Sequence, residues 1–118
     1  MLKVGILILA DTESHADMGR VSNALIIAKE FIEAGDEVKI IFDGAGSKWV
    51  TKLTDTESPL NPLYNAVQDK VDGVCSYCAA AFGVKESVEA LGLELLEEYQ
   101  GHPSLRKLVA DGYQIITF

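Results

Sequence analysis

The chain has two cysteines, and they stand close together as Cys75 and Cys78 in the segment VDGVCSYCAAAFGV. The apolar residues before Cys75 are typical of a short buried strand, and the alanines after Cys78 favour a helix. A cysteine at the start of a helix faces unpaired N–H groups and the positive end of the helix dipole, which lower the pKa of its thiol. Because the thiolate is the nucleophile, Cys75 is a candidate catalytic residue, and Cys78 could attack or assist it once it has reacted. The alternative is that both cysteines are small apolar residues that fill the core.

Other chemistries fit this cysteine pair less well. A thioredoxin-type redox site needs a cis proline before a strand, and none of the prolines here precedes a predicted strand. A closed structural zinc site needs four ligands, but the two histidines are distant from the cysteines in the sequence, so no metal is predicted. The GAG segment at 44–46 is too short for a dinucleotide fingerprint, and no cofactor is indicated. Asp11 and Asp43 stand at strand ends, as in phosphoacceptor receiver domains, but the paired acid of such domains is missing.

Four further residues are candidates for binding. His15 could tune a thiolate or act as a general base, although a solvated loop histidine is the commoner case. Gly44 and Gly46 would permit a tight turn or a close approach of the backbone. Tyr77, between the cysteines, could cover the thiol or face a partner. The second histidine, His102, is instead predicted to be a residue at the start of a helix.

Strands and helices are predicted to alternate along the chain. Apolar runs predict strands at 2–10, 37–42, 72–77 and 113–118, with an ambiguous segment at 93–99, and helical spacing predicts helices near 21–32, 49–53, 61–70, 79–91 and 103–111. Such alternation indicates a three-layer α/β/α fold around a mainly parallel sheet. Ligands of such sheets bind at the carboxyl ends of the strands, where the loops 11–20, 43–47 and 75–79 would lie together.

The length and the composition of the chain are typical of a single α/β domain, which would span residues 1–118. Eighteen acidic and ten basic side chains give a net charge of −8, which disfavours a nucleic-acid partner. No apolar run approaches the roughly 18 residues of a membrane span. The apolar start stops at Asp11 without a cleavage pattern, so it is interpreted as a strand rather than a signal peptide. We therefore expect a cytoplasmic protein with reduced thiols.

Almost the whole chain resembles the DsrE/DsrF-like family, small α/β proteins of intracellular sulfur oxidation and of sulfur relay in tRNA thiolation. The resemblance is carried by the segments KVGILILAD, IIAKEFIEAGDEVKIIFDGAGSKW, VCSYCAAAFGV and LVADGYQIITF. It implies a five-stranded parallel sheet, assembly into trimers or hexamers, and a persulfide on a cysteine eight residues before a glycine. Counted back from Gly83, that cysteine is Cys75, and Cys78 corresponds to a second cysteine of some members. Active relatives often have an arginine before this glycine, where this chain has Phe82.

The resemblance implies a sulfur-relay protein with sulfurtransferase activity. The Cys75 thiolate would take a sulfane sulfur from a donor protein, hold it as a persulfide, and pass it to an acceptor thiol. Cys78 would either receive the sulfur itself or attack the inner sulfur, which forms a disulfide and releases sulfide. An alternative is a non-catalytic oligomeric binding or assembly subunit that recognises a small anion or a partner protein. A thiol–disulfide redox role, with a reversible Cys75–Cys78 disulfide, is the third possibility.

Overall fold

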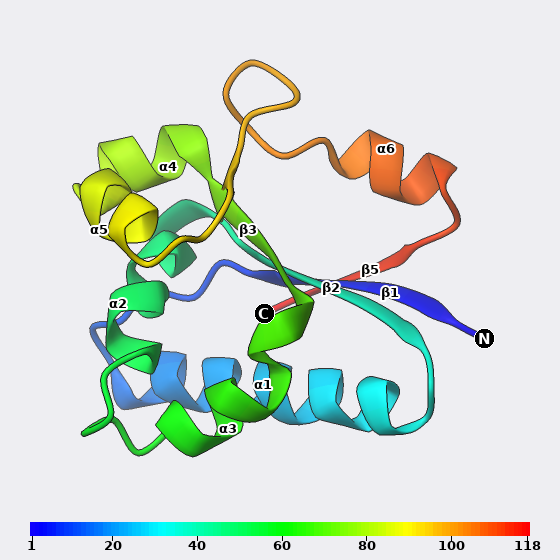
Figure 1. The fold of residues 1–118 in the computed structure, drawn as a ribbon, viewed down its shortest axis with the longest axis horizontal. Coiled ribbons are helices and arrows are strands. Elements are labelled where there is room, and N and C mark those ends of the chain that lie inside the picture. Colours follow the sequence, from blue (N-terminus) through cyan, green and yellow to red (C-terminus); the bar gives the residue numbers. More distant parts are fainter.

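One sheet of five parallel strands runs through the middle of the protein, with helices on both faces (Figure 1). The computed structural model describes all residues from 1 to 118. The strands are β1 (Lys3–Ile8), β2 (Glu37–Phe42), β3 (Val71–Cys75), β4 (Leu95–Leu96) and β5 (Gln114–Thr117), and they lie in the order β4-β3-β2-β1-β5. The predicted α/β class, the five-stranded parallel sheet and the three-layer arrangement are confirmed.

Six α-helices and two short 3-10 helices connect the strands. They are α1 (His15–Glu33), η1 (Gly44–Lys48), α2 (Trp49–Leu53), α3 (Asn61–Val67), η2 (Gln68–Lys70), α4 (Ser76–Ala81), α5 (Lys85–Ala90) and α6 (Leu105–Ala110). In Figure 1, α1 and α3 lie below the sheet and α6 lies above it. None of the helices combines the length and the apolar character that crossing a bilayer requires.

The two faces of the sheet carry different amounts of core. Successive strand residues point to opposite faces, so neighbours such as Ile6 and Leu7 enter different clusters. The face covered by α1 belongs to a cluster of 20 buried residues, and the face covered by α6 belongs to a cluster of 5. Val74 faces the larger cluster. The next residue, Cys75, therefore points to the other face, where it meets the segment 97–104 that precedes α6.

The predicted boundaries around the cysteines are wrong in two places. The strand expected at 72–77 ends at Cys75, because Ser76 already starts α4. The helix expected at 79–91 is two short helices, α4 and α5, separated at Gly83. Gly83 has a φ of +73°, a left-handed conformation that ends a helix and that glycine adopts at little cost. The ambiguous segment at 93–99 contributes only the two-residue edge strand β4.

Candidate functional site

Cys75 is the last residue of β3 and the cap of α4, and its side chain is fully buried. Its Sγ accepts a hydrogen bond from the backbone N–H of Cys78 at 3.4 Å, in the first turn of α4. Cys78 is partly exposed, and neither cysteine forms a disulfide. The three-residue spacing therefore brings both sulfurs together at the carboxyl end of β3, as the sequence predicted.

Asp43 approaches the same point from the neighbouring strand. It follows β2, which pairs with β3 in parallel, so the two strands end at the same edge of the sheet. The Cys78 thiol donates to Asp43 Oδ1 at 3.3 Å, and the Gly44 N–H donates to the same oxygen at 2.8 Å. The sequence predicted that the loop 43–47 lies beside the loop 75–79, but it gave the Asp43 carboxylate no contact with a thiol. The FDGAG turn thus contributes a carboxylate to the site.

His102 reaches the site from the loop that follows β4. The ring atom Nδ1 of His102 lies 3.3 Å from the Cys75 Sγ. The backbones of Tyr99 and His102 exchange two hydrogen bonds of 2.9 Å around a two-residue turn, in which Gln100 and Gly101 both have positive φ angles. In Figure 1 this loop rises in orange above β3 and α4.

Two contacts attach that loop to the cysteine turn. The N–H of Tyr77 donates to the carbonyl of Gly101 at 2.9 Å, and the rings of Tyr77 and His102 lie 4.9 Å apart between centroids. Tyr77 itself remains 61% exposed. Its side chain therefore lies at the surface, at the border of the site. These contacts hold the imidazole of His102 against the sulfur.

The prediction that His102 is a helix-start residue was therefore wrong. α6 begins at Leu105, and its cap is Ser104, whose hydroxyl accepts from the N–H of Lys107 at 3.2 Å. The ligand atoms of Asp43, Cys75, Cys78 and His102 instead all lie within 4.8 Å of one another. No signal in the sequence indicated this, because the strand that brings His102 there, β4, has only two residues; in the structure β4 pairs with β3 in parallel, so the loop after β4 begins at the edge where β3 ends.

The electrostatics of the site differ from the expectation of a low thiol pKa. Burial raises the pKa of Cys75 to about 12, and the nearby Asp43 carboxylate acts in the same direction. The N–H of Cys78 opposes this effect but does not overcome it. α4 has only six residues, so its dipole is small. Cys75 is consequently a neutral thiol in the resting protein, with a histidine as its nearest base.

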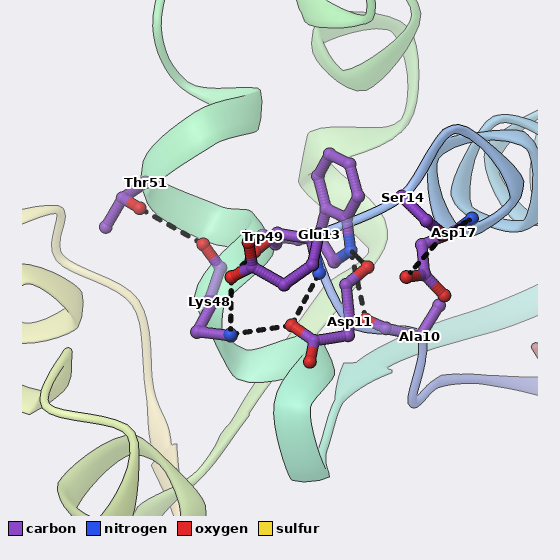
Figure 2. A network of polar contacts seen from close by, with 9 residues as sticks. Ala10, Asp11, Glu13, Ser14, Asp17, Lys48, Trp49 and Thr51 are labelled. Atoms are coloured by element: carbon purple, nitrogen blue, oxygen red, sulfur yellow. Dashed lines mark hydrogen bonds and ion pairs between the residues drawn. The ribbon is translucent and has the colours of Figure 1, made fainter.

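Of the predicted binding residues, His15 does not join the cysteines. It is exposed in the first turn of α1 and lines a separate cavity of about 490 Å³ with Trp49 and the loop 55–59. Figure 2 shows the polar network beside this cavity. Lys48 forms ion pairs with Asp11 at 2.6 Å and Glu13 at 3.4 Å.

The polar network of Figure 2 holds the loop between β1 and α1 in place. The Trp49 ring N–H donates to the carbonyls of Ala10 and Asp11, both at 3.0 Å. The contact with Lys48 lowers the pKa of Asp11 and raises that of the lysine. Lys48 also lies 5.5 Å from the ring centroid of Phe82, so a cation packs on the side chain that precedes Gly83.

Gly44 and Gly46 both have structural reasons to be glycine. Gly44 has a φ of +54°, directly after the Asp43 carboxylate. A Cβ atom on Gly46 would overlap the backbone carbonyl oxygen of Ile8, so only glycine lets η1 pack against the end of β1. The predicted tight turn and close backbone approach are confirmed. Their effect on the site is to place Asp43 beside Cys78.

Comparisons with known proteins agree with the fold and give the family of the chain. The chain is 36% identical over 116 residues to the uncharacterized protein MJ0733 of Methanocaldococcus jannaschii, a match that covers 98% of this chain and 94% of that protein. Its fold is similar to that of BT1422, a conserved protein of unknown function from Bacteroides thetaiotaomicron, with a TM-score of 0.63 and 23% identity over 97% of this chain and 94% of that chain. A model described as the DsrE/DsrF-like family matches residues 5–118. The chain therefore belongs to the DsrE/DsrF-like family.

Proposed function

We propose that this protein is a cytoplasmic sulfur-relay protein that carries a persulfide on Cys75 and passes the sulfur to an acceptor thiol. Membership in the DsrE/DsrF-like family supports a sulfur-relay role at the level of the family. The observation that carries the assignment to Cys75 is its contact of 3.3 Å with the His102 ring, because a neutral thiol needs a nearby base to become a nucleophile. The second thiol, Cys78, lies within 4.8 Å of the same atoms.

The loading step uses the histidine as a proton acceptor. With its own proton on Nε2, His102 accepts the Cys75 proton at Nδ1, and the thiolate attacks the outer sulfur of a donor persulfide. A new S–S bond forms on Cys75, the S–S bond of the donor breaks, and the donor thiolate takes up the proton from His102. One donor persulfide and one thiol thus become one donor thiol and one Cys75 persulfide, with no net oxidation.

The delivery step has two routes that involve Cys78 differently. In the first, an acceptor thiolate, or Cys78 acting as an intermediate acceptor, attacks the outer sulfur and regenerates the Cys75 thiol. In the second, Cys78 attacks the inner sulfur, which forms a Cys75–Cys78 disulfide and releases sulfide. A dithiol reductant must then reduce that disulfide before another round. The Cys78 thiol donates to the Asp43 carboxylate, so Asp43 can accept the Cys78 proton whenever Cys78 is the attacking thiol.

The partners would be a sulfur donor protein and a sulfur acceptor protein. Cys75 is fully buried, whereas Cys78 and Tyr77 reach the surface, so a partner thiol would approach over these two residues. From the family we also expect a homo-oligomer, a trimer or hexamer, which light scattering on the purified protein would measure.

Intact-protein mass spectrometry after treatment with inorganic polysulfide tests the assignment. Wild type, Cys75→Ser and Cys78→Ser would be treated under identical conditions and then compared with and without a thiol reductant. One added sulfur that is reductant-sensitive and lost only with Cys75→Ser supports the proposal. Sulfur that remains on Cys75→Ser and is lost with Cys78→Ser would move the carrier role to Cys78. No added sulfur on wild type would favour the alternative of a non-catalytic binding or assembly subunit.

A further inference from the structure

We propose that Asp43, Cys75, Cys78 and His102 form a binding site for a single Zn²⁺ ion. Four side chains of the types that bind zinc come from three separate segments of the chain: the end of β2, the turn from β3 into α4, and the loop after β4. Two sulfurs, one ring nitrogen and one carboxylate oxygen are a complete tetrahedral ligand set. The sequence offered only the two cysteines, since the histidine and the aspartate join them through the fold.

The distances between the donor atoms suit one ion. Zinc lies about 2.3 Å from sulfur and about 2.0–2.2 Å from nitrogen or oxygen, so neighbouring ligand atoms of a tetrahedral site are roughly 3.3–3.8 Å apart. The Cys75–His102 and Cys78–Asp43 distances are both 3.3 Å, and no pair among the four exceeds 4.8 Å. Shifts of less than about an ångström, within reach of side-chain torsions, would therefore close the tetrahedron.

The hydrogen-bond pattern of the site also fits a cation. The Cys78 thiol donates to Asp43 Oδ1 at 3.3 Å, and the Cys75 sulfur lies 3.3 Å from Nδ1 of His102. One Zn²⁺ can replace both thiol protons, because thiolates, a neutral imidazole and a carboxylate are the forms that bind the metal. Sulfur and imidazole ligands favour zinc over the hard cations Mg²⁺ and Ca²⁺.

The ligands are supported from outside, as metal ligands usually are. The Gly44 N–H holds the Asp43 carboxylate at 2.8 Å, the Tyr77 ring packs on His102, and the backbone bonds between Tyr99 and His102 fix the loop. With four protein ligands the ion has no open position, so the site would not activate water.

Zinc binding has a consequence for sulfur transfer, and this part rests on the proposed function. A zinc-bound Cys75 attacks a donor persulfide more slowly than the free thiolate, because the metal withdraws charge from its sulfur and holds the His102 nitrogen. Metal occupancy and sulfur loading therefore compete at this site. Zinc would protect the thiols or slow the carrier until the ion is removed.

The experiment titrates reduced, metal-free protein with Zn²⁺ in competition with a chromophoric chelator, and repeats the titration with Co²⁺ as a spectroscopic probe. We expect one ion per chain with a dissociation constant in the nanomolar range. The Co²⁺ form should show thiolate-to-metal charge-transfer absorption in the near ultraviolet and the intense visible bands of tetrahedral cobalt. Binding in the micromolar range or weaker, or a Co²⁺ spectrum without thiolate charge transfer, would overturn the proposal.

Variants separate this site from adventitious binding. His102→Ala and Asp43→Ala should each weaken zinc binding more than about tenfold, and Cys78→Ser should roughly halve the charge-transfer absorption, because one of the two thiolate ligands is lost. His15→Ala is the matched control, since that histidine is exposed and lies apart from the cluster, and it should bind zinc as wild type does. Circular dichroism checks that each variant is folded. Equal losses in His15→Ala and His102→Ala would contradict the site.

Sulfur loading is measured separately, on protein kept metal-free with a chelator. Zinc binding without any loading of the metal-free protein leaves the metal site standing and overturns the proposed function. Sulfur loading by a protein that does not bind zinc overturns the metal site and leaves the proposed function standing. Equal loading rates with and without bound zinc would overturn the competition between the two.

Discussion

The Cys75 sulfur and the His102 ring nitrogen lie 3.3 Å apart, although 27 positions separate the two residues in the chain. The parallel pairing of β3 with β4 produces this contact, because it brings the loop after β4 to the edge of the sheet where β3 ends. Under the proposed function, this buried thiol with its raised pKa would be activated by the adjacent base during the reaction rather than in the resting state.

Replacing His102 by alanine should slow polysulfide loading of metal-free protein by about 10²- to 10⁴-fold, the usual contribution of a general base. The rate of the variant should recover as the pH rises, because solvent base then generates the thiolate. Time-resolved mass spectrometry across pH measures both effects, with His15→Ala as the control that loads normally. Loading of His102→Ala at the wild-type rate would exclude the histidine from the proton transfer.

Alkylation of Cys75 should be slow at neutral pH and should keep accelerating above pH 9.0, toward the pKa of about 12. The sign follows from the chemistry: burial favours the neutral thiol, and only the thiolate reacts, so a raised pKa lowers the reactive fraction at any pH below it. The measurement uses the Cys78→Ser variant, in which Cys75 is the only thiol. A rate that reaches its plateau below pH 9.0 would show that the site lowers the pKa instead.

Gly46→Ala should lower the free energy of unfolding by at least about 2 kcal/mol, because the new methyl group overlaps the carbonyl oxygen of Ile8. Gly19→Ala is the matched control, since Gly19 lies within α1 with no atom near its missing Cβ. That substitution should be neutral or stabilising by about 0.5–1 kcal/mol. Urea denaturation of both variants gives the comparison, and equal effects would contradict the close packing of η1 on β1.

Gly101→Ala should cost about 1–2 kcal/mol of stability and also slow sulfur loading, because the residue has a φ of +83° in the turn that presents His102. Gly112 has a φ of +92° before β5, away from the cysteines, so Gly112→Ala should cost a similar amount and load normally. Denaturation and loading rates on the two variants separate loss of stability from displacement of the histidine. A Gly101→Ala protein that loads at the rate of Gly112→Ala would show that the turn does not position the base.

Much of the architecture was predictable from local pattern. Continuous apolar runs and helical periodicity indicated the alternating strands and helices, and a strand followed by a helix around Cys75 was visible in the residue types. The boundaries at Gly83 and after Cys75 were less accurate, since one left-handed glycine and one capping sulfur decide them. The two-residue strand β4 was too short for any periodic signal.

The sequence by itself determined the parallel α/β fold, the family, and the proximity of Cys75 to Cys78, because each depends on spacing within short segments. Only the tertiary structure decided that Asp43 and His102 join the cysteines and that His15 does not. It also decided the pKa of Cys75, since burial depends on everything packed around the sulfur, whereas the helix-start argument considered only the residues beside it. Parallel strands end at one edge of the sheet, and that geometry assembles a site from residues that no sequence spacing connects.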